Sequence, residues 1–407
     1  MTDTTTKAFI KAHLNDDTRQ LALQASRFPE IDMAHAINQI AGWQKARHKL
    51  SSWTKIEDLV YPPPLSMEQC SSERTAIYKA KLCQRLLHEC LAEDKETSLI
   101  DITGGFGVDF TFMAKEFHKA VYIERQQALC DIVNHNLPLL GLLNARVVKG
   151  DAMELLHEMP VCSVIYADPA RRDSHGGRTY AISDCTPDIL SAESTLLRKS
   201  SMVIIKLSPM LDILKTINDL QRQQPDIVRE IHVVASDNEC KELLIVLSNQ
   251  PIPKRIYCAN DDDILSLTME EWGGHHPLPI TTEEDIYTYP YLYEPNAAIM
   301  KAGCFHALTT RYQLKALSAS SHLFLSTTFH DHFPGRKFRI SAVSTLNKRE
   351  IRQKLSGITH ANITTRNFPT TAMQLRKRLK LNDGGTHYIF ATTTATCTHL
   401  LFICTKM

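Results

Sequence analysis

The sequence has little of what marks several special classes of protein. Its 407 residues include only 15 Gly and 18 Pro, and none of its 11 Cys belongs to a C-x-x-C pair. The low Gly and Pro content excludes collagen-like and low-complexity chains, and scattered, odd-numbered cysteines exclude a disulfide scaffold and a cysteine-rich zinc site. We therefore expect free thiols, no bound metal and a reducing, cytoplasmic environment.

Long apolar runs are also missing. No stretch approaches the ~18 residues that a membrane helix needs, and the polar start has no signal-peptide core. With 43% hydrophobic and 22% charged residues, the composition is typical of a soluble globular protein with roughly two to four domains. The sequence predicts no membrane partner.

The whole chain has almost no net charge, but its two parts carry large charges of opposite sign. The whole chain carries 46 Lys+Arg and 45 Asp+Glu, a charge of +1 that by itself argues against nucleic acid. Residues 333–407 hold 13 of the basic residues and only 2 acids, so they carry +11 and residues 1–332 carry −10. This division makes the last 75 residues a candidate surface for a polyanion.

The first 65 residues are predicted to form a helical segment. Asp32 is a good N-cap for a helix whose Met33, Ile37 and Ile40 lie on one face. The proline run at 62–64 ends any helix, because each ring removes an N–H and favours extended geometry before it. We take it as the boundary of the next domain.

Residues 66–250 alternate between helix and strand patterns. Ser71 and Ser72 precede a helical stripe, and short apolar runs follow at 99–102, 121–123, 146–148, 164–167, 202–207, 231–235 and 243–247. Such alternation predicts an α/β fold with a doubly wound, Rossmann-like parallel sheet, and the short link between the last two runs predicts an antiparallel pair.

The regular alternation of helix and strand patterns does not continue in the rest of the chain. A linker is expected at 273–277, and a small α+β domain is expected at the basic end. Its elements are a helix at 370–380, a turn at 382–385 and strands at 388–391 and 400–404.

Candidate site residues lie where the predicted parallel strands end, which is where ligands bind in open α/β sheets. The first strand runs into Asp101-Ile-Thr103-Gly104-Gly105-Phe-Gly107, a turn in which glycines let a ligand approach the backbone. Phe110 stands where a dinucleotide fingerprint needs a third small residue, which disfavours a nicotinamide-dependent oxidoreductase.

The next three strands each end near an acid. Glu124 lies where a carboxylate accepts from ribose hydroxyls, and Asp151 could accept from an adenine amino group. The fourth strand ends in Asp168-Pro169-Ala170-Arg171-Arg172, in which Pro169 stiffens the exit, Asp168 could accept from a nucleobase and the arginines could hold phosphate.

The motifs DITGGFGVDF, YIERQ, GDA and ADPARRD resemble, in order and spacing, the class I S-adenosylmethionine-dependent methyltransferases. EQCSSERTAIYKA, DPARRDSHGGR and RNFPTTAMQLRKRLKLNDGG resemble a bacterial group of these enzymes with ferredoxin-like and THUMP-like C-terminal domains. This resemblance implies a methyltransferase domain at 66–250, a ferredoxin-like domain at 275–332 and a basic THUMP-like domain at 333–407.

The resemblance also implies S-adenosyl-L-methionine as cofactor and RNA, most often tRNA or rRNA, as partner. The cofactor site would comprise Asp101, Thr103, Gly104, Gly105, Gly107, Glu124, Asp151 and Asp168. The catalytic residues would be Asp168, Pro169 and Arg171. The cations expected to bind RNA are Arg366, Arg376, Lys377, Arg378 and Lys380, with Phe368 close by as an aromatic that is either core or a stacking platform.

One departure keeps alternatives open. Amino-group methyltransferases commonly have a second Pro and an aromatic after the Asp-Pro pair, whereas Ala170 and Arg171 stand here. Cys185 is a candidate nucleophile for methylation of a pyrimidine carbon, although a lone Cys is usually structural. A non-catalytic RNA-binding protein on a methyltransferase scaffold is the alternative function.

Overall fold

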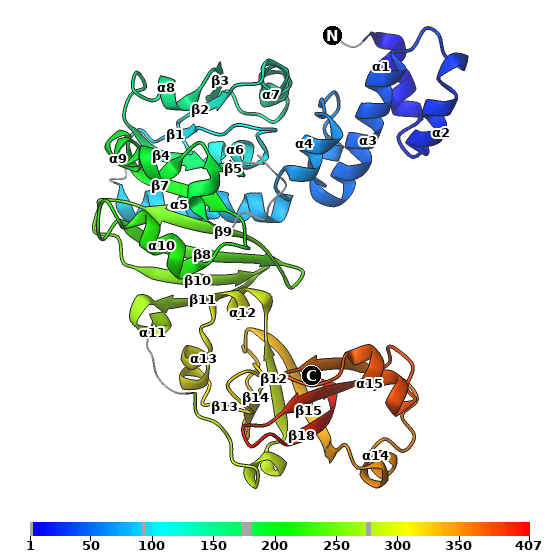
Figure 1. Ribbon diagram of the computed structural model, residues 1–407. Helices are drawn as coiled ribbons and strands as arrows, with labels where there is room; N and C mark the ends of the chain where they lie inside the picture. Colours follow the sequence, from blue (N-terminus) through cyan, green and yellow to red (C-terminus); the bar gives the residue numbers. More distant parts are fainter. Residues whose placement is uncertain (1–2, 92–94, 172–180, 274–277) are drawn as a thin grey trace. The chain divides into compact units, whose positions relative to one another are not determined.

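The computed structural model describes residues 3–91, 95–171, 181–273 and 278–407. The chain divides into two compact units, Met1–Ile231 with Leu243–Pro253, and His232–Glu242 with Lys254–Met407. The division runs through a hairpin between two strands, so neither unit is one continuous segment. Figure 1 shows the helices and strands of both units.

The first unit begins with the predicted helical segment. It contains α1 (Thr4–Ala12), α2 (Thr18–Leu23), α3 (Met33–Lys49) and α4 (Pro64–Gln69). Asp32 caps α3 as predicted, because its Oδ1 accepts from the backbone N–H of His35 at 3.0 Å. Phe9 and Leu21 pack against the buried face of α3.

The proline run does not separate this helical segment from the rest of the first unit. The backbone of Val60 forms two hydrogen bonds of 2.9 Å with the side chain of Asn136 on α7 (Gln127–Leu139). Trp53 and Phe106, from either side of the prolines, lie in one buried cluster with ring centroids 5.3 Å apart. The expected domain boundary is therefore bridged by packing and by hydrogen bonds.

A nine-stranded sheet has the order β11-β10-β8-β9-β7-β4-β1-β2-β3. Its strands are β1 (Ser98–Asp101), β2 (Lys119–Glu124), β3 (Ala145–Lys149), β4 (Cys162–Ala167), β7 (Ser200–Leu207), β8 (Val228–Ser236), β9 (Glu239–Leu247), β10 (Arg255–Asn260) and β11 (Asp263–Thr268). The first five of these are parallel to one another, and β9 runs antiparallel to β7.

The doubly wound α/β prediction is thereby confirmed. Every residue of β4 is buried, as expected for a parallel strand covered on both faces. α5 (Glu73–Cys90) precedes the first strand, and the helices that lie between strands in the chain include α6 (Val108–Met113), α8 (Ala152–Leu155), α9 (Ile189–Lys199) and α10 (Ile213–Leu220). Ser72 caps α5 by accepting from the N–H of Thr75. The predicted antiparallel pair is the β8–β9 hairpin, whose turn uses positive φ at Asp237 and Asn238.

The order of the strands reverses at β1, which fixes the place of the site. The chain passes from β1 outward to β2 and β3, and then returns to β4 and β7 on the other side. The carboxyl ends of β1 and β4 therefore border the topological switch point, where ligands bind in sheets of this kind.

The second unit is built on a seven-stranded sheet of order β13-β14-β12-β15-β18-β17-β16. Its strands are β12 (Tyr291–Pro295), β13 (Lys315–Ala316), β14 (Phe324–Ser326), β15 (Gly335–Thr345), β16 (Asn362–Arg366), β17 (His387–Thr393) and β18 (His399–Lys406). Its helices include α12 (Ala297–Ala302), α13 (Phe305–Arg311), α14 (Lys348–Lys354) and α15 (Ala372–Leu379). The predicted helix at 370–380 and the two strands after it are confirmed.

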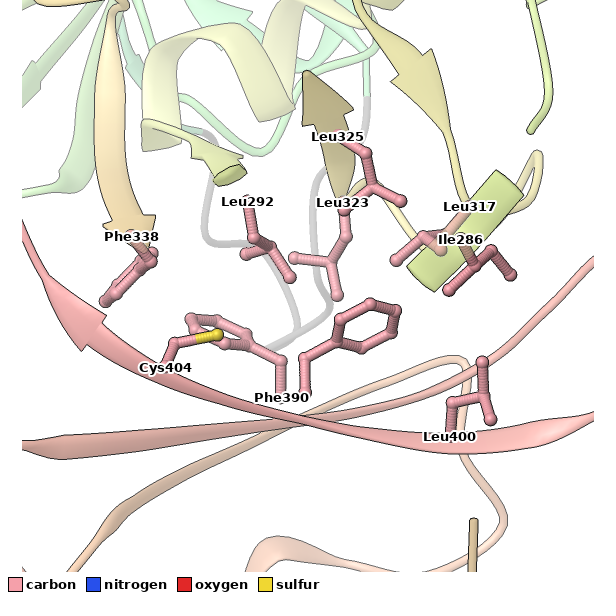
Figure 2. Close-up of a cluster of buried hydrophobic side chains, with 10 residues drawn as sticks. Ile286, Leu292, Leu317, Leu323, Leu325, Phe338, Phe390, Leu400 and Cys404 are labelled. Atoms are coloured by element: carbon pink, nitrogen blue, oxygen red, sulfur yellow. The ribbon is translucent and has the colours of Figure 1, made fainter. Parts of the chain in front are cut away.

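Both faces of this sheet are covered by apolar side chains. One face holds a cluster that includes Phe338, Phe390 and Phe402, which we call the Phe338 cluster (Figure 2). The rings of Phe338 and Phe390 make an edge-to-face contact, with their centroids 4.7 Å apart. The other face holds Leu375 and Leu379 of α15. Because β12 pairs with β15, residues 291–295 and 335–345 share one sheet. Of the expected linker at 273–277, Gly273 is the last residue of the helix α11 (Met269–Gly273), and residues 274–277 lie outside the described residues.

Candidate functional site

The predicted acids lie at one edge of the sheet. Asp101 and Glu124 are the last residues of β1 and β2, Asp151 follows β3 by two residues, and Asp168 follows β4 directly. In the parallel register Asp101 lies opposite Tyr122 of β2 and Tyr166 of β4. The strand ends thus bring three of these acids to neighbouring strands around the switch point.

The glycine turn after β1 needs its glycines. Gly104, Gly105 and Gly107 all have positive φ, at 25°, 65° and 75°. A Cβ on Gly104 would approach the carbonyl oxygen of Ile123 to 2.7 Å, so this glycine lets the turn lie against β2. A Cβ on Gly105 would meet only one atom, at 3.8 Å. The backbone at Gly105 therefore faces open space, which suits close approach of a ligand.

Glu124 holds this turn in place. Its Oε2 accepts from the N–H of Gly105 at 2.9 Å, and its Oε1 accepts from the N–H of Gln126 at 2.8 Å. The hydroxyl of Tyr122 donates to the carbonyl oxygen of Gly105. Since a carboxylate has about four acceptor sites, two remain on Glu124 for hydroxyl groups of a ligand.

Asp101 is buried beneath the turn, with 2% of its surface exposed. Its Oδ1 accepts from the N–H and the hydroxyl of Thr103, at 2.9 and 3.1 Å. Desolvation raises the pKa of Asp101 to about 8, against the effect of these hydrogen bonds, and the nearby charges of Asp109 and Asp168 add to the rise. Thr103 also accepts from the N–H of Asp168 at 2.7 Å, which joins the ends of β1 and β4.

Asp151 is tied to the protein through both oxygens. Oδ1 accepts from the N–H of Met153 at 2.8 Å, as the N-cap of α8, and Oδ2 lies 2.6 Å from Arg125. Its side chain is 30% exposed. The carboxylate thus has a fixed position at the edge of the site.

Asp168 is joined to a buried group of charges. Lys206 Nζ lies 2.6 Å from Asp168 Oδ2, 3.0 Å from Ser71 Oγ and 3.4 Å from Asp109 Oδ2. The Asp168 side chain is 42% exposed and that of Lys206 only 14%. The ammonium group therefore fixes the carboxylate from below while its outer side stays open to a substrate.

Asp109 is the centre of this group. Its Oδ2 accepts from Ser71 and Tyr166, both at 2.7 Å, and its Oδ1 lies 3.1 Å from Lys79, whose side chain is fully buried. Although burial alone would raise it, the pKa of Asp109 is held well below its usual value by the two lysines and the two hydroxyl donors. Two ammonium and two carboxylate groups thus neutralise one another.

Of the four residues in this ion network, the sequence predicted only Asp168 as a site residue and missed Lys79, Asp109 and Lys206. Two unusual features of the sequence could have indicated the network. Lys206 interrupts the apolar run 202–207 of β7, and Lys79 lies on the buried face of α5 next to Ala76 and Ala80. A lysine is almost never fully buried unless it is paired.

The segment after Asp168 is only partly described. Ala170–Arg171 forms β5, which pairs with β6 (Cys185–Thr186). The side chain of Arg171, a predicted catalytic residue, and all of Arg172 lie outside the described residues. Cys185 is 4% exposed, which favours the structural interpretation of this thiol.

The cations predicted to bind RNA fall into two groups. Arg366 forms an ion pair of 2.9 Å with the buried Glu294, and Arg376 pairs with Asp383. Lys377, Arg378 and Lys380 are exposed on α15 and at its end. Phe368 packs at the edge of the apolar cluster against α15.

Neither a metal-binding cluster nor a membrane helix occurs among the described residues. They contain no group of three or more His, Cys, Asp or Glu side chains that could hold a metal ion. They also contain no helix of the length and hydropathy that crossing a membrane requires.

Two sequence families match the C-terminal part of the chain. A ferredoxin-like domain family matches residues 291–334, and a THUMP domain-like family matches residues 335–406. No curated protein matches the chain.

Solved structures provide the widest comparison. A Porphyromonas gingivalis W83 protein described as a "putative methyltransferase" is 32% identical, with a TM-score of 0.83, over 99% of this chain and 97% of that one. An O-methyltransferase from Bacillus cereus in complex with SAH is 10% identical (TM-score 0.34; 51% of this chain, 91% of that one). An rRNA methylase from Streptococcus thermophilus is 18% identical (TM-score 0.31; 41% and 94%).

The raised pKa of Asp101 predicts a pH-dependent stability. The unfolded Asp ionises near pH 4, whereas the folded one ionises near pH 8. Between these values the folded state binds the additional proton, so this carboxyl makes the protein less stable as pH rises. Asp101→Asn keeps the acceptor for Thr103 but cannot ionise.

We expect the free energy of unfolding of Asp101→Asn, minus that of the unchanged protein, to increase between pH 5 and pH 9 by several kcal/mol. Urea unfolding at a series of pH values measures it. Asp131→Asn, an exposed carboxyl on α7, is the control. A difference that stays constant with pH would contradict the burial argument.

Proposed function

The chain belongs to the family of class I methyltransferases that end in ferredoxin-like and THUMP-like domains, and from this premise we propose that it transfers a methyl group from S-adenosyl-L-methionine to RNA, with tRNA or rRNA as the substrate class. One observation carries the proposal: the open glycine turn lies between a fixed Glu124 and a buried Asp101 at the switch point of the sheet. Glycine backbone and flanking acids suit a nucleoside with a cationic amino-acid part.

The cofactor would be held by residues from three strand ends. Glu124 has acceptor sites left for both ribose hydroxyls, and Asp151 borders the adenine side. Asp101, Thr103 and the three glycines border the methionine part, where a carboxyl with a raised pKa would ionise beside an ammonium group. S-adenosyl-L-methionine supplies a methyl group already activated on a sulfonium.

Because the methyl group is activated, the protein mainly has to position the acceptor atom. Asp168 is proposed to accept a hydrogen bond or a proton from that atom, since its outer side is exposed. Pro169 stiffens the backbone beyond it, and Arg171 is proposed to hold phosphate. Lys206 is the positioning residue, because it fixes one carboxylate oxygen and leaves the other available.

The basic C-terminal domain is proposed to capture the RNA. Of the five predicted cations, Lys377, Arg378 and Lys380 are exposed and suited to phosphate contacts. Arg366 and Arg376 are in ion pairs with acids, so we assign them a smaller contribution. A cytoplasmic location is also proposed, supported by eleven cysteines that are all free thiols.

Glu124 is predicted to be needed for cofactor binding. Glu124→Ala removes the acceptor for the ribose and for Gly105, so we expect S-adenosylmethionine to bind roughly 10- to 150-fold more weakly. Isothermal titration calorimetry measures this. Glu158→Ala, an exposed acid after α8, should bind normally. If the unchanged protein shows no measurable binding of S-adenosylmethionine, the proposed cofactor is wrong.

Asp168 is predicted to act in transfer rather than in cofactor affinity. Asp168→Asn should lower the rate of transfer of labelled methyl from S-adenosylmethionine to total RNA by roughly 100-fold or more, because the amide cannot accept a proton. Asp131→Asn is again the control. If the unchanged protein binds S-adenosylmethionine and RNA but transfers no label, the alternative of a non-catalytic RNA-binding protein holds instead. That alternative is favoured by Ala170 and Arg171, which stand where amino-group methyltransferases commonly have a second Pro and an aromatic residue.

The exposed cations predict the salt dependence of RNA binding. Replacing Lys377, Arg378 and Lys380 together by Ala should reduce the slope of log affinity against log salt by about 2, since each phosphate contact on a single strand contributes ~0.7. Electrophoretic mobility shifts over a range of salt measure it. The control replaces three exposed lysines of the first unit, Lys81, Lys115 and Lys215. Equal slopes for both variants would refute this assignment of the RNA surface.

A further inference from the structure

The second unit contains a pocket that none of the roles above uses. It has a volume of about 570 Å³ and lies between η5 (Asp285–Thr288), β15 and α14. We call it the β15 pocket, and its defining residues are Tyr287, Tyr289, Ile340, Val343, Glu350 and Lys354. Its volume lies within the ~300–1,000 Å³ that is usual for pockets of small organic ligands.

A β-bulge makes the apolar floor of this pocket. Ile340 pairs with Cys404 and Ala342 pairs with Ile403, so Ser341 has no partner in the ladder with β18. Ile340 and Val343 are three residues apart, yet both pack against the Phe338 cluster shown in Figure 2. A regular strand would send them to opposite faces. The extra residue therefore places two apolar side chains side by side, next to the exposed Ser341.

Two tyrosines form the wall beside this floor. Tyr289 packs against the Phe338 cluster, whereas Tyr287 is 61% exposed. An exposed aromatic ring beside an apolar floor offers a flat surface on which another ring can stack. Stacking of this kind is how proteins bind unpaired bases of single-stranded RNA.

The opposite wall supplies charges of both signs. Glu350 is fixed, because its Oε2 accepts from the N–H and the hydroxyl of Thr345 at 2.9 and 2.8 Å. These bonds lower the pKa of Glu350, so it stays ionised and has acceptor sites left for an amino group. Lys354 is exposed one turn further along α14, whose residues Lys348–Lys354 carry four cations and one acid.

We propose that the β15 pocket binds one unstacked nucleobase of the RNA, with the base stacked on Tyr287 over Ile340 and Val343. Glu350 accepts from an amino group on the base edge, and Lys354 contacts the adjacent phosphate. Charge favours this occupant over other flat ligands, because residues 333–407 carry +11 and α14 carries +3. The inference rests on the proposed function, since it assumes that RNA is the substrate.

The test uses the full chain and a ten-nucleotide single-stranded RNA that contains 2-aminopurine, a base whose fluorescence falls when it stacks. Tyr287→Ala should weaken binding roughly 5- to 150-fold and abolish part of the quenching. Tyr287→Phe keeps the ring and should keep both. Ile264→Ala, an exposed apolar side chain on β11, is the matched control and should bind like the unchanged protein.

A duplex RNA of the same length separates stacking from charge. Paired bases cannot enter the pocket, so Tyr287→Ala should leave duplex affinity unchanged. The nucleobase proposal is wrong if Tyr287→Ala loses equal affinity for both probes. It is also wrong if this variant binds the single strand with unchanged affinity and quenching. Either result would leave RNA binding by the protein intact. If the unchanged protein binds neither probe, the proposed function itself fails at its RNA substrate.

Discussion

The site depends on the mutual neutralisation of four charges inside the first unit. Lys79 from α5, Asp109 from α6, Lys206 from β7 and Asp168 after β4 come from four separate segments of the chain. Removing one partner of the buried Lys79–Asp109 pair costs ~3–5 kcal/mol, because the other charge is left in a medium that solvates it poorly. These ion pairs hold α5, α6, β7 and the end of β4 in one arrangement, which fixes the position of Asp168.

Charge is used differently in the second unit. Its basic end carries +11, but part of this charge is structural. The buried Glu294 of β12 pairs with both Arg336 and Arg366, which ties β12 to β15 and β16. Arg376 pairs with Asp383 in the turn after α15. The cations that can contact a polyanion are those that do not stabilise the fold through such ion pairs. The exposed Lys377 and Arg378 of α15 and Lys354 of α14 are examples.

The fold was readable from the sequence because its determinants are local. Apolar runs flanked by helical stripes predict parallel strands, and parallel strands bring their carboxyl ends to one edge, so Asp101, Glu124 and Asp168 could be placed together without coordinates. The glycines were readable for the same reason, since a turn that lies against the next strand leaves no room for a Cβ. The Porphyromonas gingivalis relative is similar over almost the whole chain, in agreement with that fold.

The sequence by itself determined the order of the strands along the chain, the acids at their ends and the division of charge between the two parts. Only the tertiary structure decided which charges meet. Lys79 and Lys206 are 127 residues apart, and they share Asp109 because α5 and β7 pack beside the same strand ends. It also decided, through one extra residue in β15, that Ile340 and Val343 share a face. Periodicity and capping are local in the chain, whereas ion pairing and strand register depend on which distant elements pack together.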